Sequence, residues 1–429
     1  MPELIVTKNM DVPGLDTLEV YQQHDGYQGL KKALNEYQPD ELVEMVKKSG
    51  LRGRGGAGFP TGMKWGFLAK NDKPRYLCCN SDESEPGTCK DRMMMEKNPH
   101  QLVEGVAICC YACRINTAFI FVRGELPYAA RQVERAVEEA YAAGYLGENI
   151  LGSGYSLDVI VHRGAGAYIC GEESALMEAL EGRRGYPRLK PPFPAAVGVY
   201  GGPTVINNCE TLSTLPAILR NGADWYASVG TEKSKGTRVF CLSGQVKKPG
   251  LYELPINTSF RTLIYEHGGG ILHDRQIKAF VPGGSSAPLL APDKLDVTMD
   301  YESVAAAGSM AGAGAIIVIS DETCIVSAVL RMTEFYRDES CGKCTPCREG
   351  TYWLTEILHR LEHGGGKQKD LDLLLDVCDN IAGKSFCPLG DAATSSIVSG
   401  IKLFREEFAE HVRQGACPMH GSRPRIEAR

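Results

Sequence analysis

The sequence predicts a mixed α/β protein that joins an N-terminal α/β sandwich, a β-grasp (ubiquitin-like) module and a C-terminal four-helix bundle. Strand and helix patterns alternate over residues 1–236, which is typical of an open α/β sheet. A hairpin pattern opens residues 237–321, and from residue 322 onward the apolar residues recur with helical periodicity. The predicted domains are therefore residues 1–236, 237–321 and 322–429.

In the first domain, Pro39 and Asp40 open an amphipathic helix that Gly50 ends, and a glycine-dense loop follows. Three strands are expected from apolar runs, at Arg75–Asn80, Ala118–Val122 and Leu157–Val161. Three helices are expected between and after these strands, at Leu102–Tyr111, Leu126–Ala143 and Ser174–Leu180.

In the second domain, strand patterns at Val239 and Gly250 flank a Lys-Pro-Gly turn and predict a hairpin, which a helix from Phe260 to Glu266 should follow. Four helices are expected in the third domain, at Ile325–Tyr336, Tyr352–Leu361, Leu371–Ile381 and Ala392–Val412. A bundle is the simplest packing of these four helices.

Composition excludes several classes of protein. The chain has 429 residues, a formal net charge of −6 and no basic run, which argues against a nucleic-acid partner. Its N-terminus has no secretory pattern, and its most apolar stretches, residues 102–113 and 305–319, are shorter than a bilayer span of roughly 18–20 residues. We therefore expect no direct membrane insertion, and reduced or metal-bound thiols. Five cysteines are expected to act as buried apolar residues: Cys78, Cys79, Cys109, Cys110 and Cys113.

The cysteine pattern of the third domain indicates a metal centre. Cys341, Cys344 and Cys347 form a CxxCxxC triplet, and Cys387 lies further downstream in a Cys-Pro pair. A triplet with one remote thiolate is typical of a four-iron cluster, whereas zinc sites usually use two separated pairs. Zinc stays open as the alternative. Cys378 and Cys417 are alternative fourth ligands, although Cys387 carries the Cys-Pro pair that closes bacterial ferredoxin motifs.

The loop from Gly53 to Gly58 matches GxGxxG, but a helix precedes it where a dinucleotide-binding fingerprint requires a strand. The first domain is thus Rossmann-like only in a non-classical sense. Glycines still let backbone N–H groups approach an anion, and Arg54 and Lys64 would add charged donors. A phosphate site is favoured, and a surface loop without a ligand is the alternative.

Carboxylates and amides follow two predicted turns. Asn80 and Asp82 come directly after a strand, where open sheets place ligands, and they suit polyol hydroxyls. Glu172 and Glu173 would accept ribose hydroxyls and repel a 2′-phosphate, or would serve only as first-turn helix residues. Aromatic residues near these loops suggest ring stacking, although each could be a core residue: Phe59, Phe67, Tyr168 and Phe193.

Five motifs together resemble one family. They occupy residues 52–65, 80–88, 164–174, 207–211 and 340–348, and they span nearly the whole chain. In this order they resemble the NADH-binding flavoprotein subunit of bacterial respiratory complex I, an NADH:quinone oxidoreductase.

The resemblance implies FMN, a 4Fe-4S cluster and NADH as substrate, with Glu85 and Tyr168 in the reaction. The implied FMN-binding residues are Gly53, Arg54, Gly55, Lys64, Asn80, Asp82, Glu83, Gly171, Glu172, Asn207, Asn208 and Thr211. The implied NADH-binding residues are Phe59, Phe67, Glu85, Tyr168, Glu173 and Phe193. The implied cluster ligands are Cys341, Cys344, Cys347 and Cys387.

The resemblance also implies an activity and an assembly. NADH would give a hydride to FMN, and the cluster would receive electrons singly. The partners would be a thioredoxin-like 2Fe-2S protein and a larger multi-cluster protein, at a cytoplasmic location peripheral to the membrane. Open alternatives are the diaphorase component of an NAD-reducing hydrogenase or formate dehydrogenase, a non-catalytic iron–sulfur scaffold, and a nucleotide sensor with structural zinc. The short segment before the glycine loop favours complex I.

Overall fold

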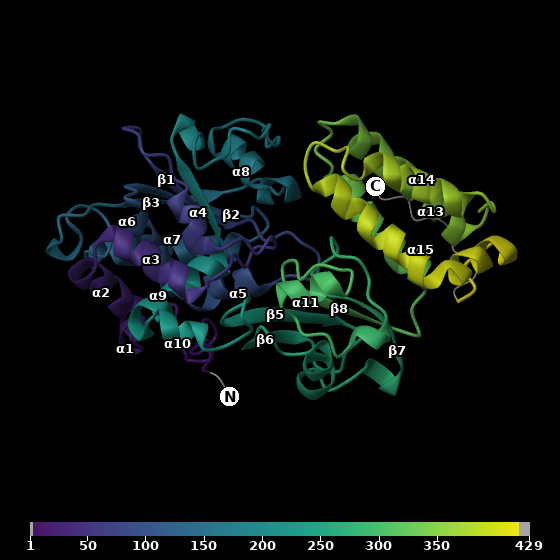
Figure 1. Ribbon diagram of the computed structural model, residues 1–429, viewed down its shortest axis with the longest axis horizontal. Coiled ribbons are helices and arrows are strands. Elements are labelled where there is room, and N and C mark those ends of the chain that lie inside the picture. Colours follow the sequence, from purple (N-terminus) through teal and green to yellow (C-terminus); the bar gives the residue numbers. More distant parts are fainter. Residues whose placement is uncertain (1–2, 420–429) are drawn as a thin grey trace.

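The computed structural model describes residues 3–419, which form two four-stranded sheets, helices around the first sheet and a C-terminal group of helices (Figure 1). This mixed α/β architecture agrees with the predicted class. The C-terminal helices, green to yellow in Figure 1, lie to one side of both sheets. Within residues 3–419, no helix combines the length and the apolar character that crossing a membrane requires.

The first sheet is parallel throughout and has the strand order β3-β2-β1-β4. The strands are β1 (Tyr76–Ser81), β2 (Thr117–Val122), β3 (Asp158–Arg163) and β4 (Thr204–Asn208). The chain moves outward from β1 to β3 and then returns to place β4 on the other side of β1. The strand order therefore reverses between β1 and β4, the position at which open α/β sheets form ligand crevices.

Helices cover this sheet because a parallel sheet buries both of its faces. The helix α6 (Pro99–Cys113) is apolar on nearly every side and lies in the core against α9 (Cys209–Asn221). The five cysteines expected to be buried apolar residues are buried on β1 and α6. The other helices are α1 (Leu18–Gln23), α2 (Gln28–Glu36), α3 (Pro39–Ser49), α4 (Thr61–Gly66), α5 (Lys90–Lys97), α7 (Pro127–Ala142), α8 (Glu173–Leu180), α9 (Cys209–Asn221) and α10 (Ala223–Ala227).

The second sheet is mixed, with the strand order β6-β5-β8-β7. Its elements are β5 (Thr237–Gly244), β6 (Gly250–Pro255), β7 (Ile277–Val281), α11 (Tyr301–Ala306) and β8 (Ala315–Ser320). The predicted hairpin is the antiparallel pair β5–β6. The helix predicted from Phe260 is instead a wide π-helical turn at Thr262–His267, because the Gly268 N–H reaches the carbonyl of Leu263, five residues back.

Four helices follow the second sheet: α12 (Ile325–Glu339), α13 (Thr345–His363), α14 (Asp370–Ile381) and α15 (Leu389–Gln414). Each contains one of the helices predicted for this segment, and each extends beyond it. They share an apolar core that includes Val329, Leu358, Leu374 and Ile401. Because α12 runs opposite to α13 and α15 in chain direction, the loops around Cys341 and Cys387 meet at one end of the group.

Candidate functional site

A cavity of about 490 Å³ lies where the strand order of the first sheet reverses. This volume falls within the range of ligand pockets, about 300–1,000 Å³. The cavity also reaches the segments after β7 and before α15. Its wall includes Gly55, Gly56, Asn80, Asp82, Glu83, Glu85, Lys90, Asp91, Tyr168, Gly171, Glu172, Asn208, Ser286, Cys387 and Leu389.

The glycine loop forms one side of the cavity and is fixed by side chains on both flanks. The Arg54 N–H donates to Thr211 Oγ1 over 2.8 Å, and Tyr301 Oη donates to the Gly53 carbonyl over 2.8 Å. A Cβ atom at Gly55 would lie 3.0 Å from Asn208 Cβ, so a side chain there would crowd the edge of the cavity. The loop thus presents a preformed stretch of backbone to a ligand.

The Arg54 side chain points away from the cavity. It is buried, and its Nη2 donates to Tyr226 Oη and to the carbonyls of Lys235 and Thr237 over 2.8–2.9 Å. Lys64 also lies outside the cavity wall, with its Nζ 3.5 Å from Glu173 Oε2. The sequence predicted that Arg54 and Lys64 would bring positive charge to an anion. In this geometry neither side chain lines the cavity.

Lys90 brings a positive charge to the cavity wall instead. Its side chain is only 1% exposed, and Nζ lies 2.7 Å from Asp91 Oδ1 and 3.0 Å from Glu210 Oε2. Burial alone would lower the pKa of Lys90, but the neighbouring carboxylates outweigh burial and raise it. Sequence reasoning missed Lys90 because a single lysine after a loop carries no recognisable signal, whereas its partner Glu210 comes from a distant helix.

Two carboxyl groups of the cavity wall have raised pKa values. Burial raises the pKa of Asp82 to about 7. Burial and the nearby Asp91 raise the pKa of Glu83 to about 8, even though Glu83 accepts backbone hydrogen bonds from Asp91 and Arg92. Asn80 is oriented by its Nδ2, which donates to the Gly171 carbonyl over 2.8 Å. These groups offer both donors and acceptors to a polyol or a heterocycle.

Glu85 and Tyr168 meet across the cavity. Tyr168 Oη donates to Glu85 Oε2 over 2.7 Å, and Glu85 Oε1 accepts the Ser286 N–H over 2.7 Å. Burial, and then the charge of Glu85, raise the pKa of Tyr168, so its hydroxyl stays protonated. The Tyr168 N–H also donates to Glu339 Oε2 at the end of α12 over 3.0 Å. This pair therefore links both sheets to the C-terminal helices.

Glu172 and Glu173 share a cation that sequence reasoning missed. Lys190 Nζ lies 2.7 Å from Glu172 Oε1 and 2.7 Å from Glu173 Oε1. Glu172 also caps α8, since its Oε2 accepts the N–H groups of Ser174 and Ala175. Glu172 thus lies one position before the first turn that was its alternative interpretation, Glu173 lies in that turn, and Glu172 borders the cavity as well.

The remaining predicted residues are divided between the cavity rim and its surroundings. Asn208 lines the cavity and caps α9, whereas Asn207 Oδ1 accepts a hydrogen bond from Trp65 Nε1 over 2.9 Å. Three predicted stacking rings are exposed and lie outside the cavity wall: Phe59 (45% exposed), Phe67 (59%) and Phe193 (59%). Phe59 and Phe67 lie close together, with ring centroids 6.1 Å apart.

Four cysteines surround a second, smaller hollow beside the cavity: Cys341, Cys344, Cys347 and Cys387. Cys344 Sγ accepts the Phe386 N–H over 3.4 Å, and the Ser340 hydroxyl lies 3.1 Å from Cys347 Sγ. Such hydrogen bonds to sulfur tune iron–sulfur clusters. The alternative fourth ligands lie elsewhere, since Cys378 is buried on α14 and Cys417 follows α15. The residues that border both this hollow and the cavity are Ile169, Cys387 and Leu389.

Comparisons with known proteins agree with both parts of this geometry. The family model of the Nuo51 FMN-binding domain matches residues 46–217, which supply most of the cavity wall. The model of the NADH-ubiquinone oxidoreductase-F iron-sulfur binding region matches residues 327–411, which contain the four cysteines. The SLBB domain model matches residues 239–290.

Curated relatives match over almost the full length. The NADH-quinone oxidoreductase F-subunit 2 of Rhizobium meliloti (strain 1021) is 53% identical over 98% of this chain and 100% of the relative. The chain belongs to the family of NADH-quinone oxidoreductase F-subunits. The F-subunits of Streptomyces coelicolor and Mycobacterium tuberculosis (strain H37Rv) are 57% and 54% identical, over 94% and 96% of this chain and 89% and 94% of their own lengths.

A solved structure shares the fold of this F-subunit. It is an NAD+-reducing [NiFe]-hydrogenase in the H2-reduced state, with a TM-score of 0.83 and 33% identity over 96% of this chain and 67% of that chain. This chain therefore has the same fold as part of a hydrogenase. Its sequence identity to the F-subunits, and the share of their length that it covers, are both higher than for the hydrogenase chain.

Proposed function

We infer that this chain is the electron-entry component of an NADH-quinone oxidoreductase, in which NADH is oxidised and electrons leave through an iron–sulfur cluster. The observation that carries this function is the common wall of the ligand cavity and the cysteine hollow. When bound, FMN supplies the exchange between hydride transfer, which moves two electrons together, and single-electron transfer to a cluster. The chain's own residues bind, orient and insulate these groups.

The cavity suits FMN on two counts. Its volume of about 490 Å³ matches a cofactor pocket. A glycine cradle that a Cβ atom would crowd shares the cavity wall with the charge of Lys90, which suits a phosphate. We propose Lys90 as an addition to the FMN-binding residues, which are Gly53, Arg54, Gly55, Lys64, Asn80, Asp82, Glu83, Gly171, Glu172, Asn207, Asn208 and Thr211. In this proposal Arg54 contributes through its backbone.

NADH is proposed to bind over the same cavity, with Glu85 and Tyr168 at the reacting end. Their hydrogen bond of 2.7 Å supports this role, because it fixes a protonated hydroxyl at a single orientation in the wall. The exposed rings at the loops around it offer stacking surfaces. The proposed NADH-binding residues are Phe59, Phe67, Glu85, Tyr168, Glu173 and Phe193.

The cysteine hollow is proposed to hold the 4Fe-4S cluster on Cys341, Cys344, Cys347 and Cys387. Four thiols around one small hollow are the donor set that such a cluster needs. The position of Cys387 in this hollow, and of Cys378 and Cys417 outside its wall, supports Cys387 as the fourth ligand.

We propose three domains at residues 1–236, 237–321 and 322–429, namely an α/β sandwich, a β-grasp-like module and a four-helix bundle. The separate sheets of the first two segments and the four consecutive helices of the third support this division. The proposed partners are a thioredoxin-like 2Fe-2S protein and a larger multi-cluster protein, in an arm peripheral to the cytoplasmic face of the membrane.

A diaphorase role in an NAD-reducing hydrogenase is the second candidate function, and the fold that this chain shares with such an enzyme favours it.

The decisive experiment separates the flavin from the cluster. The purified chain should contain FMN and reduce ferricyanide with NADH. Cys387→Ser should lose the cluster's electron paramagnetic resonance signal and keep NADH-dependent flavin bleaching, whereas Cys378→Ala should keep both. A chain without flavin, or a cluster lost in Cys378→Ala and retained in Cys387→Ser, would contradict the proposal. Co-purification with quinone-reducing proteins or with a hydrogenase decides between the two assemblies.

A further inference from the structure

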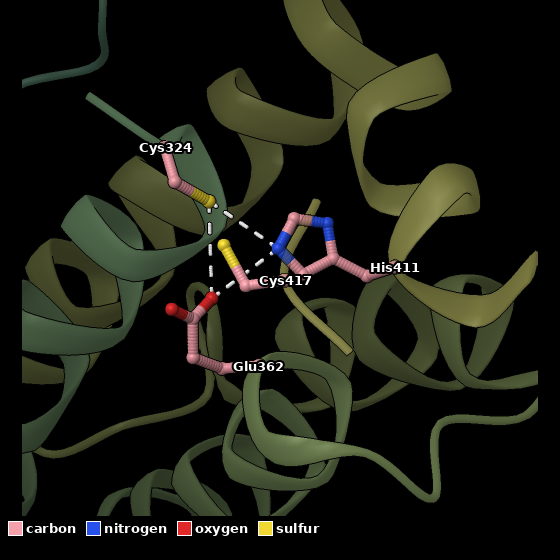
Figure 2. Close-up of side chains that lie close together, drawn as sticks. All are labelled: Cys324, Glu362, His411 and Cys417. Atoms are coloured by element: carbon pink, nitrogen blue, oxygen red, sulfur yellow. Dashed lines mark hydrogen bonds and ion pairs between the residues drawn. The ribbon is translucent and has the colours of Figure 1, made fainter. Parts of the chain in front are cut away.

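The helices that carry the cysteine hollow hold a second group of ligand side chains at their opposite ends. Cys324 precedes α12, Glu362 lies in the last turn of α13, and His411 lies in the last turn of α15, with Cys417 just beyond. Figure 2 shows these side chains pointing toward one another from separate segments. We call this group the buried tetrad, and its members are Cys324, Glu362, His411 and Cys417.

The spacing of the buried tetrad fits one small metal ion. Its ligand atoms all lie within 4.8 Å of one another. His411 Nε2 is 3.3 Å from Cys324 Sγ and 3.3 Å from Glu362 Oε2, and Cys324 Sγ is 3.8 Å from Glu362 Oε2. Tetrahedral zinc, with bonds of about 2.0–2.3 Å, separates its ligand atoms by about 3.3–3.8 Å. These three distances already match the edges of such a tetrahedron.

Neighbouring groups orient the ligands as metal sites require. His411 Nδ1 lies 2.8 Å from the Glu407 carbonyl, so Nδ1 carries the proton and the lone pair of Nε2 faces the tetrad. Cys324 Sγ accepts the Ser327 N–H over 3.4 Å in the first turn of α12, which fixes the direction of this side chain. The Cys417 N–H donates to the Glu362 carbonyl over 3.2 Å, which fixes the segment after α15 against the end of α13.

The burial of the tetrad argues for a cation at its centre. Its members are 0–6% exposed, and the Glu362 carboxylate lies inside the helical core with Oε2 facing the unprotonated Nε2 of His411. Burying a carboxylate and polar groups without full compensation is unfavourable by several kcal/mol. Two thiolates and one carboxylate would carry three negative charges, and one divalent ion would neutralise two of them. Sulfur and imidazole donors select zinc over calcium or magnesium.

We propose that the buried tetrad is a structural zinc site. All four positions of the tetrahedron are filled by protein ligands, so the site is closed, as in structural and not catalytic zinc centres. The ion would join the start of α12 to the ends of α13 and α15. The three helices that position the cysteine hollow would then be held together at both ends.

Metal analysis of the intact, cofactor-loaded protein tests the proposal. We expect about one zinc per chain in addition to cluster iron, and zinc X-ray absorption with about two sulfur neighbours at about 2.3 Å and two nitrogen or oxygen neighbours at about 2.0–2.1 Å. Cys417→Ala and His411→Gln should each lose the zinc. Two controls should keep it: Cys378→Ala, a buried cysteine of the same helical core, and Cys341→Ser, which should lose iron only.

The wild-type measurements need no variant, so they decide the matter even where a substitution prevents folding. Zinc below about a tenth of an atom per chain, with zinc supplied during growth, would overturn a site of this affinity class. Zinc retained in both Cys417→Ala and His411→Gln would also overturn it. A Cys324–Cys417 disulfide found by non-reducing peptide mapping, or an additional iron in place of zinc, would do the same.

Discussion

Lys90 occupies a position where its charge has almost no contact with water, between Asp91 and Glu210. Replacing it with methionine would leave two buried carboxylates without their cation, which typically lowers the free energy of unfolding by about 3–5 kcal/mol. We therefore expect Lys90→Met to lower the melting temperature of the flavin-free protein clearly. Lys48→Met is the matched control, because Lys48 pairs with Asp224 on the surface, where such a pair contributes about 0–1 kcal/mol. Equal melting temperatures for both variants would contradict the buried role.

We expect Glu173 to set the preference for NADH over NADPH. It pairs with Lys64 and Lys190, and without its carboxylate Lys64 would lose this partner and Lys190 would keep only Glu172, so more positive charge would face a 2′-phosphate. Glu173→Ala should raise the ratio of kcat/KM for NADPH to that for NADH by about tenfold, equal to about 1.4 kcal/mol. Glu178→Ala, on the same helix but paired with Arg183 and Arg188, should leave the ratio unchanged. An unaltered ratio in Glu173→Ala would remove this role.

At the residue scale, local motifs could be predicted but their partners could not. The asparagine, carboxylate and glycine motifs at the cavity were visible because each follows a turn or a strand. Lys90 and Lys190 were not, because their charge partners include residues that only the folded chain brings near. The direction of the Arg54 side chain was hidden for the same reason, since its acceptors belong to residues 226–237.

Helices α6 and α9 pack unusually closely because Gly105 has no side chain. A Cβ atom there would lie 2.0 Å from the Leu212 carbonyl oxygen, which belongs to the backbone of α9 and cannot move aside. We expect Gly105→Ala to destabilise the protein by about 3 kcal/mol, the upper part of the range for overpacking. Gly66→Ala is the control, since its Cβ would meet only the flexible end of Lys47. Thermal unfolding of both variants tests this, and equal stability would contradict it.

At the element scale, the predictable segments are those with long, uninterrupted patterns. The strands β1 to β3 and the helices α12 to α15 correspond to sequence predictions, although α13 begins well before the predicted helix. The helix α9 was missed because Pro216 interrupts its pattern, and β4 was missed because it spans only five residues and runs directly into α9. The pairing of β4 with β1 is a tertiary interaction that no local pattern encodes.

At the scale of the whole molecule, Glu253 on β6 holds the N-terminal segment against the second sheet. Its carboxylate accepts the N–H groups of Ile5, Val6 and Thr7 over 2.8–3.2 Å. Hydrogen bonds to a charged group contribute about 1.5–3 kcal/mol each when buried. Glu253→Gln should therefore speed hydrogen exchange of these three amides by at least about tenfold, while amides of α6 stay protected as an internal control. Unchanged exchange would show that other contacts hold this segment.

The order in which the chain is synthesised bears on the cysteine hollow. Three of its thiols lie between the end of α12 and the first turn of α13, but the fourth, Cys387, follows α14. A ribosome therefore releases the first three well before the fourth, and during that interval they are exposed without the helix that completes their enclosure. Assembly of a complete four-thiol site must wait until the start of α15 has emerged and packed against α12. The four thiols can therefore close around one hollow only late in translation.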